Sequence, residues 1–544
     1  MKDSNTHKYL IINTLKDSLH LKHYVLCLLF LVFTLTPVNA QMRSSQIDSL
    51  VRKAMETIDN TVGFSIGVVK NGEILHAKGY GLTSINTNKK VTVNTPFGIA
   101  SNTKAFTSAA LSILVDQGKL HWEDKVIDHI PEFKMYNEYV TNHFNIQDLL
   151  THRSGLGLGV GDLMIFPNDS NFTMDDVINS FQHFTPTSAF RTKFDYDNLL
   201  YLVAGELTAR VSGQSWESFV DEQIIKPLGM KNSSASFSGL SNDENVAVPH
   251  AYIDHSLVAL ENNNIPQKMN GAAGGIWSSA SDMCTWMLTQ LHKGKYGVDL
   301  NTTLFSEQQQ QEMWEMHTPM HKQSDPNSPF KSHFYGYGLG WFVSDFNGYL
   351  KIEHTGLIAG MASEVILIPE LDLGIVLLNN SEKSGMLNGL ISYALLDEFL
   401  NLQTGINWIE MASGMQQQQS SMIDTETEAI WQQINSNKNT KINKEKYVGV
   451  YEDQWFGKVE IFDKKGDLWF KSYKSPRLNG KMSYYKDHTF AIQWEYQDMN
   501  ADAFAIFSLD ENDKSQSIKM KGISRFIDFS FDFQDLHLHR IIKK

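Results

Sequence analysis

Two groups of short apolar strands lie far apart in this chain, and they constrain its fold more than any other feature. The first covers residues 61–81, where two alternating apolar stretches are joined by Asn71-Gly72, a dipeptide typical of two-residue hairpin turns. The second covers residues 337–379 and ends with two stretches joined by a turn at Pro369–Asp372. Because helical patterns and polar loops fill the interval, we expect one antiparallel sheet closed by distant segments.

Helices are expected between and after these strands. Residues 102–117 place apolar side chains on one helix face and are followed by Gly118, a typical C-cap. A further helix over 387–402 could pack on the sheet. The predicted fold class is therefore α+β over residues 41–408: an antiparallel sheet flanked by helices, with a helical insertion.

The composition changes near residue 410. Residues 409–445 are polar and rich in Gln and Asn, which indicates a linker with room for one helical stretch. From 446 to 544 the chain consists of short aromatic strands separated by turn signals, which predicts a small all-β domain, a sandwich or a barrel. No nucleophile–base pair recurs there, so we expect this domain to fold separately and to be dispensable for chemistry.

The composition excludes some classes of protein. Hydrophobic residues make up 42% of the chain, which excludes wholesale disorder. Lys and Arg number 47 against 61 Asp and Glu, a formal charge of −14. Nucleic acids and anionic membrane surfaces require a basic footprint, so neither is expected as a partner. Nothing in the sequence predicts an oligomeric state.

The N-terminal region has the pattern of a secretory signal peptide. An uncharged apolar run, 24–37, follows Lys16 and Lys22 and leads into Val38-Asn39-Ala40. The run is shorter than the roughly 20 residues that a membrane-spanning helix needs. We therefore expect residues 1–40 to be removed, with no membrane anchor left, and the protein to be periplasmic or extracellular. Removal would leave Cys284 as the single cysteine, so no internal disulfide is expected.

Ser101 and Lys104 are the first candidate catalytic pair. They lie three positions apart at the expected start of the 102–117 helix, on one face and within reach of each other. A helix N-terminus favours a developing oxyanion and disfavours a protonated amine. Burial would lower the pKa of Lys104 further and make it a base for a nucleophilic Ser101. The pattern alone also fits an N-cap serine beside a solvated lysine.

Two further motifs follow along the chain. Tyr196 and Asn198 would point to the same side of an extended segment and offer a proton relay and a carbonyl-binding donor. Taken alone, they also fit an ordinary turn. His354-Thr355-Gly356 follows a strand-like stretch, where glycine would allow a ligand backbone to approach the sheet edge.

The order and spacing of these three motifs resemble the serine β-lactamase and penicillin-binding-protein superfamily. The chain is most similar to the class C β-lactamase-like branch, which includes CubicO-type serine peptidases, esterases and D-aminopeptidases. The region after 447 is similar to the lipocalin-like barrel often appended in that branch. The resemblance spans roughly residues 45–400. The segments that support it are LLTHRSGL (149–156), KPLGM (226–230), GAAGGIWSSASDM (271–283), YGYGLGWFV (335–343) and 354–380.

The resemblance implies acyl transfer through a covalent serine ester. Ser101 would attack a carbonyl carbon, while Lys104 and Tyr196 would take the hydroxyl proton and return it to the leaving group. The backbone N–H groups of Ser101 and Leu357 would form the oxyanion hole. No cofactor or metal is implied, and the substrate would be a small molecule or a peptide. Substrate binding would fall to Asn198, His354, Thr355 and Gly356.

The third motif departs from the pattern usual in β-lactamases and carboxypeptidases, which carry Lys where this chain has His354. A mostly neutral imidazole can hydrogen-bond the Tyr196 hydroxyl or a substrate carbonyl, but it anchors a carboxylate weakly. The expected function is therefore a serine hydrolase of esters, amides or peptides, including those of D-amino acids. The alternatives are a β-lactamase or D-alanyl-D-alanine carboxypeptidase, and a catalytically silent binding or sensor protein on the same fold.

Three other residue patterns compete with this interpretation. Residues 63–67 match the G-x-S-x-G nucleophile elbow, but Ser65 lies inside a predicted strand rather than at a strand-to-helix turn. His317 and His321 have metal-pair spacing, but Pro319 between them disfavours a helix and no third ligand is evident. His152 is expected to fix a loop rather than to act as a base.

Overall fold

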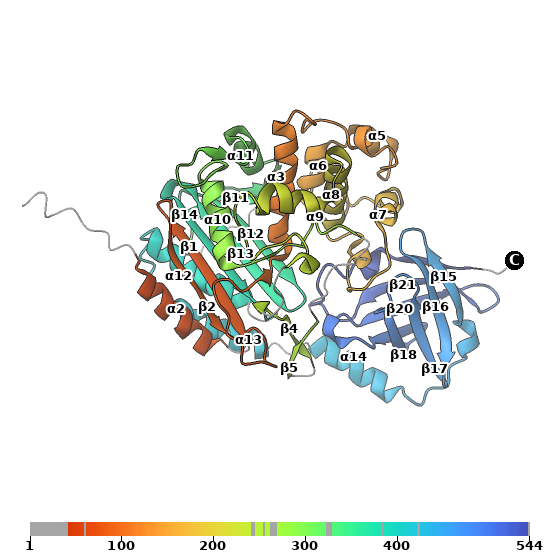
Figure 1. Ribbon diagram of the computed structural model, residues 1–544. Coiled ribbons are helices and arrows are strands. Elements are labelled where there is room, and N and C mark those ends of the chain that lie inside the picture. The colour runs from red at the N-terminus through yellow and green to blue at the C-terminus, as the bar shows by residue number, and fades with distance from the viewer. Residues whose placement is uncertain are drawn as a thin grey trace, which may run out of the picture.

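The computed structural model shows two units side by side, a sheet-and-helix unit and a smaller barrel (Figure 1). The expected signal peptide lies outside the described part of the chain. The residues described are 42–58, 61–240, 245–253, 256–261, 269–321, 329–381, 385–421 and 425–541.

An eight-stranded sheet forms the centre of the larger unit, and its pairs are antiparallel. The N-terminal strand β1 pairs with β14 near the other end of this unit, in a register from Phe64 opposite Asn379 to Lys70 opposite Leu373. Asn71 and Gly72 both have positive φ, as the predicted hairpin turn requires. The sheet predicted from two distant strand groups is confirmed. Its order is β2 (Glu73–Gly81), β1 (Gly63–Lys70), β14 (Leu373–Asn379), β13 (Met361–Ile368), β12 (Tyr349–Ile358), β11 (Phe342–Phe346), β10 (Tyr335–Tyr337) and β9 (Thr318–Pro319).

Helices cover both faces of this sheet, so its central strands are buried on both sides (Figure 1). On one face α3 (Thr103–Asp116) and α10 (Ala280–Leu291) share a hydrophobic core with the sheet. On the other face lie α2 (Ser44–Thr57), α12 (Gly385–Phe399) and α13 (Trp408–Ser421). Cys284 of α10 is fully buried and packs as a small core residue.

The predicted helical insertion lies between β2 and β9. Helix α8 is central to it and packs against α3, α6 and α7. Asp197 caps α8 by accepting the Leu200 backbone N–H at 3.2 Å. The helices are α4 (Val126–His129), α5 (Glu138–His143), α6 (Ile146–Leu150), α7 (Met174–Ser180), α8 (Asn198–Ser212), α9 (Trp216–Val220), α10 and α11 (Glu307–Trp314).

The C-terminal strands close into an eight-stranded antiparallel barrel. Its last strand pairs with both the first and the preceding strand, so the closed barrel has no free sheet edge. Of the two expected alternatives, the barrel is the one observed. The strands are β15 (Gly449–Asp453), β16 (Gly457–Lys464), β17 (Asp467–Ser472), β18 (Asn479–Lys486), β19 (Thr489–Trp494), β20 (Ala503–Leu509), β21 (Ser515–Gly522) and β22 (His537–Arg540).

The segment predicted as a linker, residues 409–445, is instead largely helical. Helix α13 packs on α12 and α2 and buries Trp408, so it extends the larger unit. Helix α14 (Thr425–Ser436) packs on β18 and buries Ile434 against the barrel. The sequence left room for one helical stretch here, and the structure has two, each packed on a different unit. Gln is a good helix former, so a glutamine-rich segment is compatible with helix.

The barrel packs closely against the helical insertion. Trp455 lies against Phe184 with ring centroids 5.3 Å apart, and Phe456 lies against Phe172 at 5.7 Å. Lys474 forms an ion pair with Asp176 of α7 at 2.7 Å. Because the aromatic side chains are buried, the two units share one continuous hydrophobic core.

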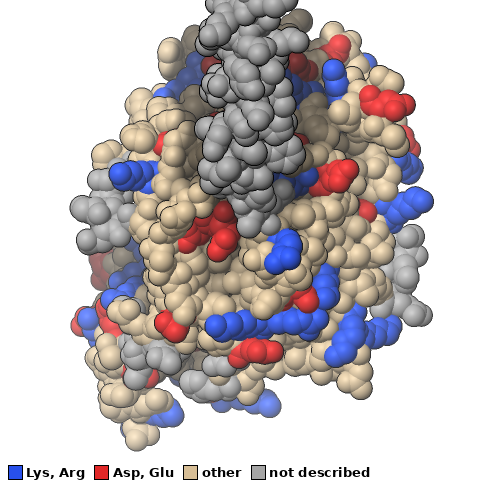
Figure 2. Space-filling view, turned by 90° about the vertical axis from the view of Figure 1, so that its left-hand side faces the viewer, with Lys and Arg blue, Asp and Glu red and all other residues tan. Residues whose placement is uncertain are grey.

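Charged side chains of both signs are interspersed on the face shown in Figure 2, where the described residues form no continuous basic surface. Among the helices in the described ranges, none is long and apolar enough to cross a membrane.

Candidate active site

Ser101 lies in a 3-10 turn, Ala100–Asn102, that leads directly into α3. The residue before it, Ala100, has a φ of 47°, a left-handed conformation that is unfavourable for a residue with a Cβ. The turn is tied to β13, since Asn102 donates to the Ser363 hydroxyl at 2.8 Å and Ser363 donates to the Ile99 carbonyl at 2.6 Å. The sheet therefore fixes the nucleophile candidate in a strained, defined position.

Lys104 lies one helical turn further on and points at Ser101. Its amine donates to Ser101 Oγ at 3.1 Å, to Asn198 Oδ1 at 2.8 Å and to the Ala273 carbonyl oxygen at 2.8 Å. As an ammonium, Lys104 donates to all three acceptors; as a neutral amine, it can donate to Asn198 and Ala273 and turn its lone pair toward the Ser101 hydroxyl. Sequence alone left a solvated lysine as an alternative, and full burial of Lys104 excludes it.

Burial lowers the pKa of Lys104 to about 7, although Asp162 and Asp197 nearby act to raise it. Burial also raises the pKa of Asp197 to about 7 and that of Asp162 well above its usual range. A lysine that is substantially neutral at neutral pH can accept a proton. The amine therefore has both the position and the basicity to deprotonate Ser101.

Asn198 contacts the candidate base in addition to lining the pocket. It is the first residue of α8; its Oδ1 accepts from Lys104, and its Nδ2 donates to Asp162 Oδ2 at 2.8 Å. The amide NH₂ group has a second N–H, so the substrate-binding role expected for Asn198 stays a prediction beside its contact with the lysine. The extended geometry expected for Tyr196 and Asn198 ends at Asp197, where the helix begins.

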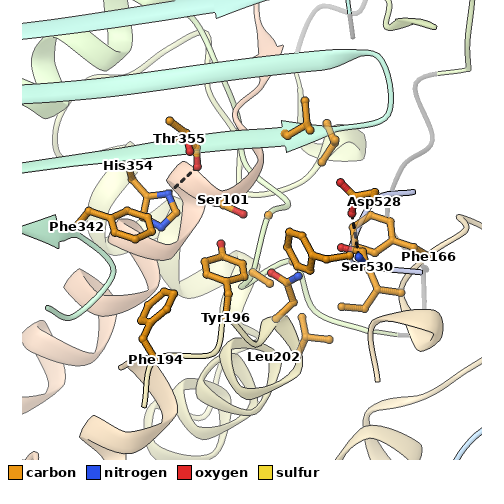
Figure 3. Close-up of a pocket in the computed structure, with 18 of the residues that line it drawn as sticks. Ser101, Phe166, Phe194, Tyr196, Leu202, Phe342, His354, Thr355, Asp528 and Ser530 are labelled. Carbon is orange, nitrogen blue, oxygen red and sulfur yellow. Dashed lines mark hydrogen bonds between the residues drawn. The ribbon is translucent and has the colours of Figure 1, made fainter. Parts of the chain in front are cut away.

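Tyr196 points toward Ser101 from below the pocket (Figure 3). Its hydroxyl is buried and has no hydrogen-bond partner of good geometry among the described residues, although the Ser101 hydroxyl lies close by. Burial raises the pKa of Tyr196 well above its usual range, so the phenol is protonated. The Lys104 amine lies 4.7 Å from the centre of the Tyr196 ring. A protonated hydroxyl in this place can pass a proton between Ser101 and a leaving group.

His354 is neutral, as expected, but its partner is not Tyr196. Burial, with a contribution from Lys104, lowers the pKa of His354 to about 3. Nδ1 lies 2.6 Å from the Thr355 carbonyl oxygen, which can only accept, so Nδ1 carries the hydrogen (Figure 3). Nε2 then accepts the hydroxyl of Tyr337 at 2.9 Å. Both ring nitrogens are used inside the protein, so His354 offers no anchor to an anion.

The edge of β12 after Glu353 faces the pocket. Pairing with β11 stops at Glu353, whereas pairing with β13 continues to Ile358. Thr355 and Leu357 line the pocket with Ser101, which agrees with the oxyanion role expected for the Leu357 N–H. Packing also requires a glycine at position 356, because a Cβ there would lie 2.3 Å from the Ile99 carbonyl oxygen. It lets the Ser101 turn pack against the strand.

The pocket beside Ser101 is a cavity of about 400 Å³ with a mainly apolar wall. Among the described lining residues there is no Lys or Arg, and the single carboxylate, Asp528, is exposed at the wall. Part of the wall comes from the C-terminal barrel, through Asp528, Phe529 and Ser530 (Figure 3). The apolar lining is Ile165, Phe166, Phe194, Leu202, Met320, Phe342, Leu357, Ile358 and Phe529.

The competing candidates lie elsewhere. Ser65 is buried in the middle of β1, with its hydroxyl directed at the Lys78 carbonyl, so no nucleophile elbow exists there. His317 and His321 flank the short strand β9, and no cluster of potential metal ligands occurs in the described ranges. His152 fixes a loop, as expected: its Nδ1 accepts the Asp197 backbone N–H at 3.1 Å.

Sequence reasoning missed three contributors to the site. Asp162 closes a glycine-rich stretch, GLGLGVGD, whose repeated glycines signal close backbone approach. Tyr337 lies in the segment YGYGLGWFV (335–343), which supports the resemblance but has no catalytic motif of its own. The barrel residues 528–530 carry no catalytic motif, and no sequence signal places them at the pocket.

Comparison with known proteins agrees with this geometry. The family model described as Beta-lactamase matches residues 47–397. A second model, described as a domain of unknown function (DUF3471), matches residues 436–540.

Among curated proteins, the chain is 29% identical over 356 residues to "Unguisins hydrolase ungD'" of Aspergillus campestris. It is 25% identical over 342 residues to "Protein flp" of Staphylococcus aureus. Each match covers 62% of this chain, which spans about 62% of the length of these relatives.

Two solved structures share the fold. The octameric penicillin-binding protein homologue from Pyrococcus abyssi has a TM-score of 0.56 and 20% identity, and the match covers 91% of this chain and 100% of that one. A class C beta-lactamase mutant has a TM-score of 0.52 and 22% identity, with 65% of this chain and 98% of that one covered.

We expect acylation of Ser101 to accelerate with rising pH across neutrality. Because neutral Lys104 is the base and its pKa is about 7, the rate should rise about tenfold per pH unit below 7 and level off above it. The measurement is the second-order rate of inactivation by a fluorophosphonate from pH 5.5 to 8.5, corrected for reagent hydrolysis. A flat profile, or a rate that falls with pH, would contradict this role of Lys104.

Proposed function

The chain belongs to the beta-lactamase family of serine hydrolases, and from this premise we propose that it hydrolyses uncharged esters, amides or peptides, including those of D-amino acids, through an acyl-Ser101 intermediate. The observation that carries the proposal is the buried Lys104 amine, 3.1 Å from Ser101 Oγ. The relative whose name describes an unguisins hydrolase supports a hydrolytic activity.

The first half of the reaction forms the acyl-enzyme. Ser101 Oγ attacks the substrate carbonyl carbon while its proton passes to the neutral amine of Lys104. The resulting oxyanion would be held by the backbone N–H groups of Ser101 and Leu357. Removal of one such donor typically raises the activation barrier of acyl transfer by about 3–4 kcal/mol.

Collapse of the tetrahedral intermediate needs a proton on the leaving group. The protonated Tyr196 hydroxyl would donate it and be reprotonated by Lys104, whose ammonium lies over the Tyr196 ring. In the second half, water attacks the acyl carbon and gives a proton to Lys104. The carboxylic acid then leaves, and Ser101 regains its hydrogen.

The charge of the pocket supports an uncharged substrate. Neutral His354 replaces the lysine usual in the third motif, and among the described lining residues none carries a permanent positive charge. A substrate carboxylate would lose hydration without gaining a cationic partner, which is costly. The apolar wall would instead bind a hydrophobic acyl group. For this reason we expect β-lactams and peptides with a free C-terminal carboxylate to be turned over less efficiently than neutral substrates.

We expect Ser101→Ala to abolish covalent labelling by a fluorophosphonate while the fold is retained. The matched control is Ser65→Ala, which changes a buried serine in β1 and should leave labelling intact. Intact-mass measurement of the treated proteins reads out the adduct, and circular dichroism checks the fold. A native protein that never acquires an adduct would instead favour a catalytically silent sensor.

We further expect a higher kcat/KM for a neutral p-nitrophenyl ester or D-alanine anilide than for nitrocefin. The physical reason is the lack of a cationic anchor in the described pocket wall, which penalises the nitrocefin carboxylate. Steady-state assays of the same preparation compare the substrates, with Ser101→Ala as the blank. A preference for nitrocefin would reverse the proposed substrate class and restore the β-lactamase alternative.

We also propose that the protein is exported and that the mature chain begins at Gln41. The apolar run before Ala40 motivates this proposal. N-terminal sequencing of protein isolated from its native host is the test, and a retained Met1 on a cytosolic product would exclude export by this route.

A further inference from the structure

A glycine-rich loop lies between the catalytic groups and the C-terminal barrel. This glycine loop, residues 155–163, has the sequence GLGLGVGDL. Gly155, Gly159 and Gly161 all have positive φ, so the loop adopts a path that residues with a Cβ rarely follow. Such a loop has little conformational preference of its own and must be held by its neighbours.

On one side the glycine loop holds the catalytic groups. The Gly159 backbone N–H donates to the Tyr196 carbonyl oxygen at 2.8 Å. Asp162 accepts the Asn198 amide at 2.8 Å, and the other end of that amide accepts the Lys104 amine. The position of the loop therefore determines where Asn198 can place the base.

On the other side the loop is held by the barrel. Asp532, in the connection between β21 and β22, accepts the Gly161 N–H at 2.7 Å with one oxygen and the Leu163 N–H at 2.9 Å with the other. These two donors flank Asp162. The ring of Phe529 packs so closely that a Cβ on Gly159 would lie 2.7 Å from it. Asp532 is fully buried, so water does not offer the two N–H groups an alternative partner.

We propose that Asp532 of the C-terminal barrel is a positioning residue for the catalytic base, acting through the glycine loop, Asp162 and Asn198 on Lys104. This inference rests on the proposed serine hydrolase function. It differs from the expectation that the barrel is dispensable for chemistry. The barrel supplies both a wall of the substrate pocket and the support under the hydrogen bonds that orient the lysine.

A carboxyl group suits this task better than other groups. Burial and the nearby Asp162 raise the pKa of Asp532 well above its usual range, while the two backbone N–H groups that it accepts act to lower it. Its two oxygens accept the N–H groups of Gly161 and Leu163, which are two positions apart, and this holds both sides of Asp162 at once. An asparagine has nearly the same shape but only one acceptor oxygen, so one N–H would face the donor NH₂ group. The replacement thus breaks half of the clamp and preserves the packing.

The test compares Asp532→Asn with Asp502→Asn. Asp502 is the matched control, since it too lies in the barrel and accepts a backbone N–H, that of Trp494 at 3.2 Å, but away from the glycine loop. We expect Asp532→Asn to lower kcat on the ester about tenfold with KM changed less than about twofold, as for a small displacement of a reacting group. Asp502→Asn should leave both constants unchanged.

A double-mutant cycle separates positioning from general loss of structure. If Asp532 acts through Asp162, the effects of Asp532→Asn and Asp162→Asn on kcat should combine less than additively, whereas those of Asp502→Asn and Asp162→Asn should add. Full additivity in the first pair would overturn the inference, as would an equal loss of kcat in Asp502→Asn.

Amide hydrogen exchange tests the inference independently of the proposed function. In Asp532→Asn, amides of residues 157–166 and 194–200 should exchange faster than in the native protein, and in Asp502→Asn they should not. This readout needs no turnover. If the native protein shows no hydrolysis and no labelling, the proposed function fails, while faster exchange still supports the coupling. Unchanged exchange in Asp532→Asn would overturn the inference even in an active enzyme.

Discussion

The active site depends on the removal of one amine from water. Lys104 is fully buried, and its three hydrogen bonds bring together parts of the chain that are far apart: the turn of Ser101, the start of α8 and the backbone at Ala273. Burying a cation without compensation is costly, so the protein both neutralises the amine and gives it acceptors. The resulting chemistry and the local packing have the same physical cause, since each acceptor that satisfies the amine also fixes its direction.

Features that depend on neighbouring residues could be predicted from the sequence. Asn71-Gly72 specifies the hairpin, and the apolar face of residues 102–117 specifies the helix that carries Lys104, with Ser101 in the turn that leads into it. The closure of the sheet by distant strands also followed, because helical patterns and polar loops fill the interval between the two groups of strands. The neutrality of His354 was anticipated from its unperturbed pKa, and burial strengthens it.

Features that depend on distant segments could not be predicted. Tyr337 replaces Tyr196 as the partner of His354 because strands β10 and β12 place it there through β11, and no local pattern encodes that register. Asn198 is turned toward Lys104 by Asp162, which belongs to a loop with no catalytic motif. Asp532 contacts that loop across the interface between the two units. The sequence pattern of each unit indicates its own fold but does not predict how the two units pack together.

The position of Asp532 also has a consequence for the order in which the chain is made. Ribosomal synthesis runs from the N-terminus, and Asp532 follows Ser101 by 431 positions (532 − 101). The nucleophile and its lysine are therefore present in the nascent chain long before the residue that clamps the glycine loop. A chain interrupted before Asp532 would carry Ser101 without that support, so full activity depends on synthesis of nearly the whole C-terminal domain.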